Sequence, residues 1–170
     1  MRRLLITAVL GAVSLAAGAS CAASGQAATP PPLGTGQRAP GATVKTLGGA
    51  PVDLSRYIGK SPVVIEFWAK WCPNCRALEP AMTAAYRAYG SRVTFLTIAA
   101  SVGETPAEVS AYAKAHALVP EVLYDETGAA VDAYGAPGTS YVVIIGRKGS
   151  IVYTGEGGDQ DLTAAIKTAL

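Results

Sequence analysis

Apolar and polar residues follow two different periods along this chain, and the change of period predicts its elements. Residues 62–69 and 92–100 are nearly continuous runs of β-branched, aromatic and aliphatic residues, which predicts two buried strands. Between them, apolar residues recur at helical spacing and Gly90 offers a stop, so we expect a helix over about 73–89. Its predicted buried stripe consists of Cys75, Leu78, Met82, Tyr86 and Tyr89. Pro80 falls inside this helix and is expected to kink it.

The remaining segments continue the pattern on both sides. Residues 42–59 alternate apolar and polar positions around two adjacent glycines, which predicts a hairpin. Thr105, Pro106 and Glu108 have the pattern of a capping box, so a helix should begin there and extend to about residue 117. We expect the rest of the chain to form a strand, a helix, two strands around a tight turn and a last helix, at residues 121–125, 129–134, 140–145, 150–155 and 159–170. This order predicts an α/β fold with a central mixed β-sheet flanked by helices.

Residues 1–21 have the layout of a secretory signal. Two arginines supply a basic start, the apolar run from Leu4 to Ala19 is shorter than a membrane span, and small residues follow. The end of this signal has two interpretations. Cys21 follows small residues in a way that resembles the box where bacterial lipoproteins are cleaved and lipidated, whereas residues 17–19 would suit an ordinary signal peptidase. We favour lipidation of Cys21, because a secreted protein would otherwise keep an unpaired thiol.

Composition separates a tether from a folded domain. Residues 22–37 are rich in Ala, Gly and Pro without any apolar period, so they cannot form a core and are expected to be a flexible tether. Residues 38–170 are long enough for one domain with a core of its own. Without Arg2 and Arg3, the 14 basic residues of the chain fall to 12, which equals its 12 acidic residues. A neutral domain without basic runs gives no support for nucleic-acid binding.

Two cysteines three positions apart, Cys72 and Cys75, are the main candidates for chemistry. A purely structural bridge across so small a loop would remove little entropy from the unfolded chain and would stabilise the fold weakly. A metal site needs about four ligands, and this domain offers no second such pair. Its single histidine, His116, is expected on a helix surface or at a helix end. We therefore favour a redox pair and expect no metal or cofactor other than its disulfide.

The predicted position of Cys72 supports this hypothesis. It falls between a strand and a helix, with Pro73 as the first helical residue. The free N–H groups and partial positive charge of the helix N-terminus should favour its thiolate. We expect Cys72 to be the more acidic and more exposed cysteine, and therefore the nucleophile. Cys75 lies one turn inside the helix, where it is shielded and can resolve a mixed disulfide.

The segment FWAKWCPNC, with Pro80 five residues further on, resembles the active site of thioredoxin-fold proteins. Residues 47–69 and 104–134 are similar to those of the TlpA/ResA-like thiol-disulfide oxidoreductases, bacterial proteins held on the outer side of the membrane. The resemblance covers residues 36–170. It implies a thioredoxin-like fold with an N-terminal β-hairpin and an inserted helix–strand segment.

The resemblance also implies roles for single residues. Cys72 would attack a client disulfide and Cys75 would resolve the mixed disulfide, while Trp71 and Pro73 would shape the surface on which the client docks. Glu66 matches a buried acid beneath the cysteine pair in these proteins. Independently, a lone acid within an apolar run should be desolvated and hold its proton, so it could exchange that proton with Cys75. The alternative is an acid at a sheet edge that reaches solvent, and we favour the role in proton transfer.

The chain departs from the family where a cis-proline usually faces the cysteines. An ungapped comparison places Ser140 at that position and Thr139 before it, so we expect both to line the docking groove. Proline at position 140 would then be tolerated. Pro137 falls three residues too early and suits a type II turn over residues 136–139. The rival interpretation is a shifted loop that brings a cis Pro137 to the cysteines.

Several activities share this fold, and the residues around the cysteines bear on the choice. Ala69 stands where related thiol peroxidases have a threonine, and Pro73 and Asn74 are uncharged where strong disulfide-forming oxidases carry a histidine. We therefore favour an extracytoplasmic protein disulfide reductase, with an oxidase, a thiol peroxidase or a non-catalytic binding lipoprotein as alternatives. Expected partners are client proteins with disulfides, such as an apocytochrome c or a mispaired periplasmic protein, and a membrane donor of electrons. We expect a monomer held at the membrane by a lipid on Cys21.

Overall fold

Seven strands form one mixed sheet at the centre of the molecule. The computed structural model describes residues 31–118 and 121–170. The strands are β1 (Thr43–Thr46), β2 (Pro51–Asp53), β3 (Val63–Trp68), β4 (Thr94–Ala99), β5 (Glu121–Tyr124), β6 (Tyr141–Ile145) and β7 (Ile151–Glu156). Their order across the sheet is β2-β1-β5-β4-β3-β6-β7. The three central strands β5, β4 and β3 run parallel, and every other pair of neighbours is antiparallel.

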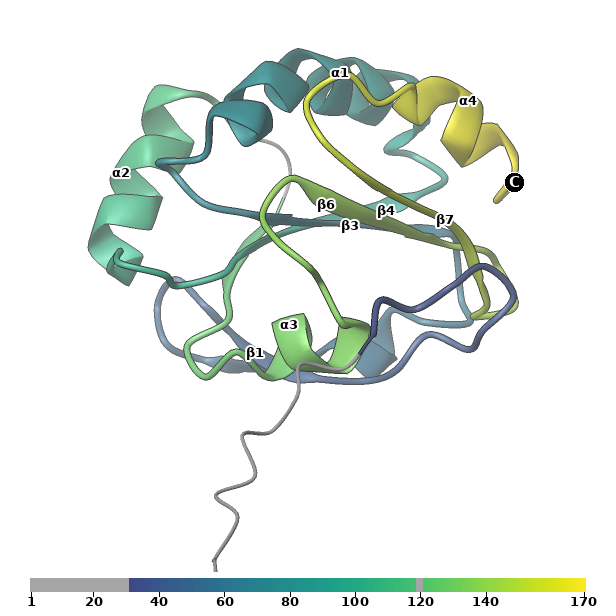
Figure 1. Cartoon of the computed structure of the whole chain (residues 1–170), viewed down its shortest axis with the longest axis horizontal. Helices are drawn as coiled ribbons and strands as arrows, with labels where there is room; N and C mark the ends of the chain where they lie inside the picture. The colour runs from purple at the N-terminus through teal and green to yellow at the C-terminus, as the bar shows by residue number, and fades with distance from the viewer. Residues whose placement is uncertain (1–30, 119–120) are drawn as a thin grey trace, which may run out of the picture.

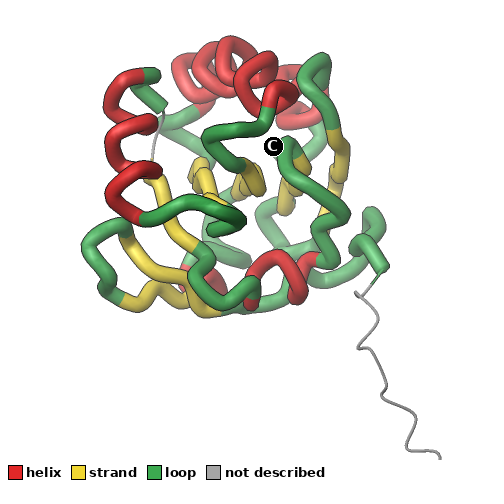
Figure 2. The backbone as a smooth tube through the Cα atoms, turned by 60° about the vertical axis from the view of Figure 1, so that its left-hand side comes forward, coloured by secondary structure: helices red, strands yellow, loops and turns green. Residues whose placement is uncertain are grey.

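Helices cover both faces of this sheet. They are α1 (Pro73–Tyr89), α2 (Pro106–Ala115), α3 (Ala129–Tyr134) and α4 (Leu162–Lys167), with a short 3-10 helix η1 (Leu54–Arg56). Figure 1 shows α1 and α4 together over one face, with α2 beside them, whereas α3 lies on the opposite face near β1. The rotated view in Figure 2 shows the same separation of the helices into two layers.

The alternation of side chains along β3 divides the core between the two faces. Val63, Ile65 and Phe67 pack in the cluster on the α3 side, whereas Val64 packs with Leu78 of α1 on the other side. Successive side chains of a strand point to opposite faces, so Glu66 shares the face of Val64. The carboxyl of Glu66 therefore lies on the side of the sheet that α1, the helix with the cysteines, covers.

The structure confirms the predicted elements, with small differences at their ends. The hairpin, the two buried strands and the long helix after the cysteines are all present. Helix α2 ends at Ala115, because Ala117 adopts a left-handed backbone conformation with φ of 50°. In the buried stripe of α1, Ala85 is fully buried, whereas Tyr86 is only half-buried.

The folded domain begins before residue 38, the boundary that composition predicted. Leu33 packs against the core and its backbone N–H donates to the carbonyl of Tyr134 at 3.4 Å. The N–H of Gly36 donates to the carbonyl of Ile151, the first residue of β7, at 2.8 Å. The end of the expected tether is therefore part of the domain. The predicted signal peptide and Cys21 lie outside the described residues. In the part of the chain that is described, no helix combines the length and apolar character needed to cross a membrane.

Candidate active site

The two cysteines form a disulfide where the chain passes from β3 into α1. Cys72 is the N-cap of the helix and Pro73 is its first residue, and the α-carbons of the two cysteines lie 5.3 Å apart. The sulfur of Cys72 accepts a hydrogen bond of 3.0 Å from the backbone N–H of Cys75. An acceptor at the N-cap position satisfies a free N–H group of the first helical turn in this way. In the reduced protein the same N–H would favour a thiolate on Cys72.

The expected difference in exposure between the cysteines is not seen in this oxidised structure. Each is 4% exposed, and both pack in a buried cluster that includes Trp68 and Ala69. Our prediction that Cys72 is the more exposed cysteine is therefore wrong for the disulfide form, because its sulfur is bonded to Cys75 within this cluster. The helix cap, and not exposed surface, distinguishes Cys72 from Cys75.

Glu66 lies in the middle of the sheet, which excludes the edge-acid alternative. It stands between Thr97 of β4 and Val142 of β6, and only 6% of its surface is exposed. Burial raises the pKa of its carboxyl from 4.5 to about 8, and repulsion from Glu79 of α1 adds to the shift. A carboxyl with this pKa holds its proton at neutral pH and exchanges it in the range where a thiol also titrates.

Glu79 connects the helix of the cysteines to α2. The hydroxyl of Tyr112 donates to one oxygen of Glu79 at 2.8 Å, and Nδ1 of His116 lies 3.1 Å from the other. His116 is the exposed C-cap of α2, as predicted, and its ring stacks on Tyr112 with a centroid distance of 3.9 Å. Within residues 31–118 and 121–170, no three His, Cys, Asp or Glu side chains are grouped so that they could hold a metal ion.

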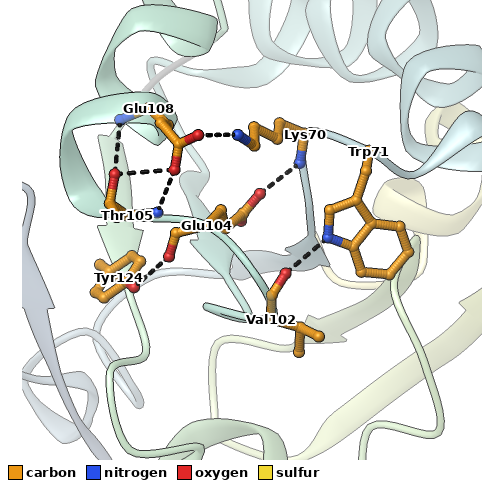
Figure 3. A network of polar contacts seen from close by, with 7 residues as sticks. All are labelled: Lys70, Trp71, Val102, Glu104, Thr105, Glu108 and Tyr124. Atoms are coloured by element: carbon orange, nitrogen blue, oxygen red, sulfur yellow. Dashed lines mark hydrogen bonds and ion pairs between the residues drawn. The ribbon is translucent and has the colours of Figure 1, made fainter.

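A polar network fixes the residues just before the disulfide (Figure 3). The carboxylate of Glu104, a residue only 6% exposed, accepts a hydrogen bond of 3.0 Å from the backbone N–H of Lys70. The ammonium of Lys70 pairs with Glu108 at 2.6 Å. The indole N–H of Trp71 donates to the carbonyl of Val102 at 2.8 Å. These bonds fasten the loop after β4 to the loop that carries the disulfide.

Glu104 is the site residue that sequence reasoning missed. Burial raises the pKa of its carboxyl, against the opposing effect of the hydrogen bond from the Lys70 N–H. The sequence shows only an acid next to the capping-box Thr105, which is an ordinary position for a solvated acid. Its partner lies 34 positions away along the chain, so only the packed fold reveals the contact.

A groove of about 330 Å³ opens beside Trp71. It is lined by Trp71, Ala100, Val102, Gly128, Val131, Ala136, Pro137, Gly138 and Thr139. Trp71 is 53% exposed and Thr139 is half-buried, so both of these expected client contacts face the groove. Pro73 is exposed at the start of α1, but it is not one of the lining residues. The groove therefore extends from the residue before Cys72 to the loop before β6.

Ser140 does not line this groove, which corrects our prediction. It is fully buried, and its backbone has a φ of 62°. Its hydroxyl accepts a hydrogen bond of 3.2 Å from the N–H of Gly157, and its carbonyl accepts one of 3.0 Å from the side-chain amide of Gln160. The side chain of Ser140 is therefore bonded to the loop after β7 and leaves the groove to its neighbours.

The turn before β6 also differs from the expectation. A type II turn over residues 136–139 needs a positive φ at Gly138, and Gly138 is not among the described glycines with positive φ. Strand β6 nevertheless begins at Tyr141, directly after Ser140, as the ungapped comparison requires. Pro137 lines the groove, but neither cysteine is among the groove's lining residues, so the rival interpretation of a cis Pro137 at the cysteines stays untested.

The comparison with known families agrees with this fold and this pair of cysteines. A family model described as the AhpC/TSA family matches residues 35–154. The chain belongs to the AhpC/TSA family. The part that matches the AhpC/TSA family contains both cysteines, Glu66 and every residue that lines the groove.

Individual proteins to which this chain is similar include a thioredoxin-like protein and disulfide oxidoreductases. The chain is 32% identical over 117 residues to the thioredoxin-like protein YneN of Bacillus subtilis (strain 168), and the matched residues cover 68% of each chain. It is 27% identical over 120 residues to the thiol-disulfide oxidoreductase ResA of the same strain, and the matched residues cover 71% of this chain and 66% of ResA. A secreted Mycobacterium tuberculosis disulfide oxidoreductase, described as homologous to DsbE of E. coli, has a TM-score of 0.64 and 26% identity, covering 75% of this chain and 93% of that one. These similarities confirm the TlpA/ResA-like resemblance and the thioredoxin-like fold.

Proposed function

We propose that this protein is an extracytoplasmic thiol-disulfide oxidoreductase that reduces disulfides in client proteins. The observation that carries the proposal is the Cys72–Cys75 disulfide at the N-terminus of α1, with Glu66 buried in β3 on the face that α1 covers. Membership of the AhpC/TSA family and the similarity to ResA support the oxidoreductase class. The three residues supply what dithiol–disulfide exchange needs, namely a nucleophile, a resolving thiol and a proton acceptor.

The reduction of a client would proceed in two exchange steps. The thiolate of Cys72 attacks one client sulfur, a bond between Cys72 and that sulfur forms, and the client disulfide breaks. The released client sulfur leaves as a thiolate and takes up a proton. The thiolate of Cys75 then attacks the sulfur of Cys72, so that the Cys72–Cys75 disulfide forms and the second client thiolate leaves and is protonated. Two electrons pass from the dithiol to the client, and a dithiol donor at the membrane returns them.

Glu66 is the group to which we assign the proton of Cys75. Cys75 is only 4% exposed, so solvent has little access to its thiol. The carboxylate of Glu66 would accept this proton before the second step, and the carboxylic acid would return it when the dithiol is regenerated. Because the pKa of Glu66 is about 8, the ionised form increases as the pH rises through that value, and resolution should accelerate with it.

The direction of electron flow rests on the residues between the cysteines. Pro73 and Asn74 are uncharged and exposed, so they add no charge that would favour the thiolate over the disulfide. This supports a reductase over a strong disulfide-forming oxidase. Clients would be proteins whose cysteines must be kept reduced outside the cytoplasm, with an apocytochrome c as one such class.

The proposed location rests on the first 21 residues and on the relatives. The solved Mycobacterium tuberculosis relative is described as secreted. A lipid on Cys21, followed by a tether rich in Ala, Gly and Pro, would hold the domain near a membrane donor. Metabolic labelling with a radioactive fatty acid tests this part: label should be incorporated into the wild type and be lost in Cys21→Ser. An unlabelled wild type would overturn the anchor.

The reduction of insulin by dithiothreitol tests the proposed activity. The purified wild type should accelerate precipitation of the insulin B chain, and Cys72→Ser should not. Cys75→Ser should instead accumulate a mixed disulfide with the client, detectable by mass spectrometry, because the resolving thiol is missing. Full activity of Cys72→Ser would overturn the assignment. Consumption of hydrogen peroxide faster than insulin reduction would favour the thiol peroxidase alternative.

A further inference from the structure

Both oxygens of Glu79, on the helix that carries the cysteines, are bonded to side chains of α2. The hydroxyl of Tyr112 donates to Oε1 at 2.8 Å, and Nδ1 of His116 lies 3.1 Å from Oε2. Because an ionised carboxylate only accepts hydrogen bonds, Nδ1 is the nitrogen that carries the hydrogen of the neutral imidazole. The side chain of Glu79 is 21% exposed and that of His116 is 33% exposed, so the pair reaches solvent through His116.

The packing of β3 brings Glu66 to this pair. Val64, Glu66 and Trp68 alternate onto the same face of the sheet, the face that α1 covers. Val64 packs in one cluster with the residue that precedes Glu79. The ring of Trp68 lies 5.5 Å from the ring of Tyr112, whose hydroxyl binds Glu79. The side chain of Glu66 therefore lies between two contacts, each of which leads to Glu79.

Titratable and charged groups face the pair from three elements, namely Glu66 of β3, Arg76 of α1 and Tyr112 of α2. Burial raises the pKa of Glu66 most, and repulsion from Glu79 raises it further. Burial and the hydrogen bond to Glu79 also raise the pKa of Tyr112, against the opposing effect of Arg76, so its hydroxyl remains a neutral donor at neutral pH. Among these types of side chain, histidine is the one whose charge ordinarily changes between pH 5 and 8.

We propose that Glu79 and His116 form a charge pair that sets the pH at which Glu66 gives up its proton. The carboxylate of Glu79 keeps the proton on Glu66, because a second negative charge beside it is unfavourable. When His116 takes up a proton, its imidazolium cancels the charge of Glu79, and Glu66 ionises more easily than it otherwise would. The inference rests on the proposed function, in which Glu66 accepts the proton of Cys75. Glu79 and His116 are then positioning residues that act through Glu66.

The charge pair makes the supply of the Glu66 carboxylate less sensitive to acid. A fall in pH adds a proton to Glu66 and so removes the acceptor for the proton of Cys75. The same fall in pH charges His116, which favours the ionised form of Glu66, and the two effects oppose each other. Glu66 and His116 therefore titrate as coupled groups, and the ionisation of Glu66 extends over a wider pH range than that of an isolated carboxyl.

NMR titration of isotope-labelled glutamate carboxyls tests the charge pair without any client. The signal of Glu66 in the oxidised protein is identified by its loss in Glu66→Gln. In Glu79→Gln the midpoint of the Glu66 titration should fall by about half a pH unit or more, because the repelling charge is gone. His116→Arg places a permanent positive charge beside Glu79 and should also lower the midpoint. His116→Gln cannot become charged and should leave the midpoint at the wild-type value or above it.

Glu126→Gln is the matched control, because it removes an exposed carboxylate that pairs with Lys45, and it should leave the midpoint unchanged. The rise of mixed-disulfide resolution with pH should move in each variant by the same amount as the midpoint of Glu66. An unchanged midpoint in Glu79→Gln would overturn the charge pair, and so would equal midpoints in His116→Arg and His116→Gln. Midpoints that move as expected in a protein that cannot reduce insulin would instead overturn the proposed function and leave the charge pair in place.

Discussion

The backbone N–H of Gly157 donates a hydrogen bond of 3.2 Å to the hydroxyl of Ser140, and this bond ties the loop before β6 to the loop after β7. The side-chain amide of Gln160 strengthens the tie, because it donates to the carbonyls of both Ser140 and Gly157 at 3.0 and 2.7 Å. Ser140 occupies the left-handed region with φ of 62°. Its neighbour Thr139 thereby stays at the groove while Ser140 itself is buried.

Replacing Ser140 with proline should destabilise the protein strongly, contrary to what the family resemblance suggested. The proline ring fixes φ near −65°, which is incompatible with the observed 62°, so we expect a loss of about 3 kcal/mol or more. Ser140→Gly should be far milder, because glycine adopts positive φ freely and the gain offsets part of the lost hydrogen bond. Urea unfolding of the three proteins measures the difference. A Ser140→Pro protein as stable as the wild type would show that the loop adopts another conformation.

The sequence was sufficient for the fold because each prediction depended on local pattern. The continuous apolar run around Ile65, the capping box at Thr105 and the turn between β6 and β7 all specify their elements without distant contacts. The burial of Glu66 followed from the same logic, since an acid in the middle of a buried strand has no route to solvent. These features do not depend on how the elements pack against one another.

What the sequence could not show depends on loops that meet only in the folded chain. Ser140 is held by residues 17 and 20 positions further on, and no pattern at Ser140 signals a positive φ. Glu104 is buried by contact with Lys70, far away in the sequence. The exposure of Cys72 was misjudged for a similar reason, because the bond to Cys75 keeps its sulfur inside a cluster.

Cys72 should be the first cysteine to be alkylated after reduction. Its sulfur accepts the N–H of Cys75 at the cap of α1, and an N–H donor at a helix N-terminus favours the thiolate, which is the reactive form. Brief treatment of the reduced protein with iodoacetamide at about pH 6, followed by peptide mass spectrometry, gives the site. The Cys72→Ser protein should react much more slowly, and Cys75→Ser at a rate near that of the wild type. Preferential labelling of Cys75 would reverse the assignment of nucleophile and resolving thiol.

Glu66 should make the protein less stable as the pH rises from about 4.5 to about 8. In the unfolded chain the carboxyl loses its proton near 4.5, whereas the folded chain keeps it up to a pKa of about 8. Folding therefore takes up a proton in this window, and the contribution of Glu66 to stability, complete below pH 4.5, is lost progressively at up to about 1.4 kcal/mol per pH unit. Glu66→Gln removes the ionisation and should be more stable than the wild type at pH 8 but not at pH 4.5.

The comparison with Glu66→Gln isolates this one carboxyl from the others that titrate. Urea unfolding of both proteins at several pH values between 4.5 and 8 gives the difference in free energy, in which the effects of Glu104 and Asp125 cancel. A difference that does not change with pH would mean that the carboxyl of Glu66 ionises normally in the folded protein. In the same variant, resolution of a mixed disulfide should lose its increase near pH 8, and its rate should differ least from that of the wild type at low pH, where Glu66 is protonated.

Glu104 should hold the loop that carries Lys70 and Trp71 in place through its shape and its hydrogen bond to Lys70. The negative charge of Glu104 should not be required for this. One oxygen of its carboxylate accepts the N–H of Lys70, whereas the other is buried without a hydrogen-bond partner among the described residues. Glu104→Gln keeps an acceptor for Lys70 and removes a buried charge, so its stability at pH 8 should equal or exceed that of the wild type. Glu104→Ala leaves the N–H of Lys70 without this acceptor, and the free energy of unfolding should fall by about 1–3 kcal/mol.

Quenching of tryptophan fluorescence by acrylamide reports on this loop, because Trp68 is buried and Trp71 is the accessible tryptophan. Quenching should rise in Glu104→Ala and stay at the wild-type level in Glu104→Gln. Equal quenching in all three proteins would show that Trp71 is held by Val102 alone.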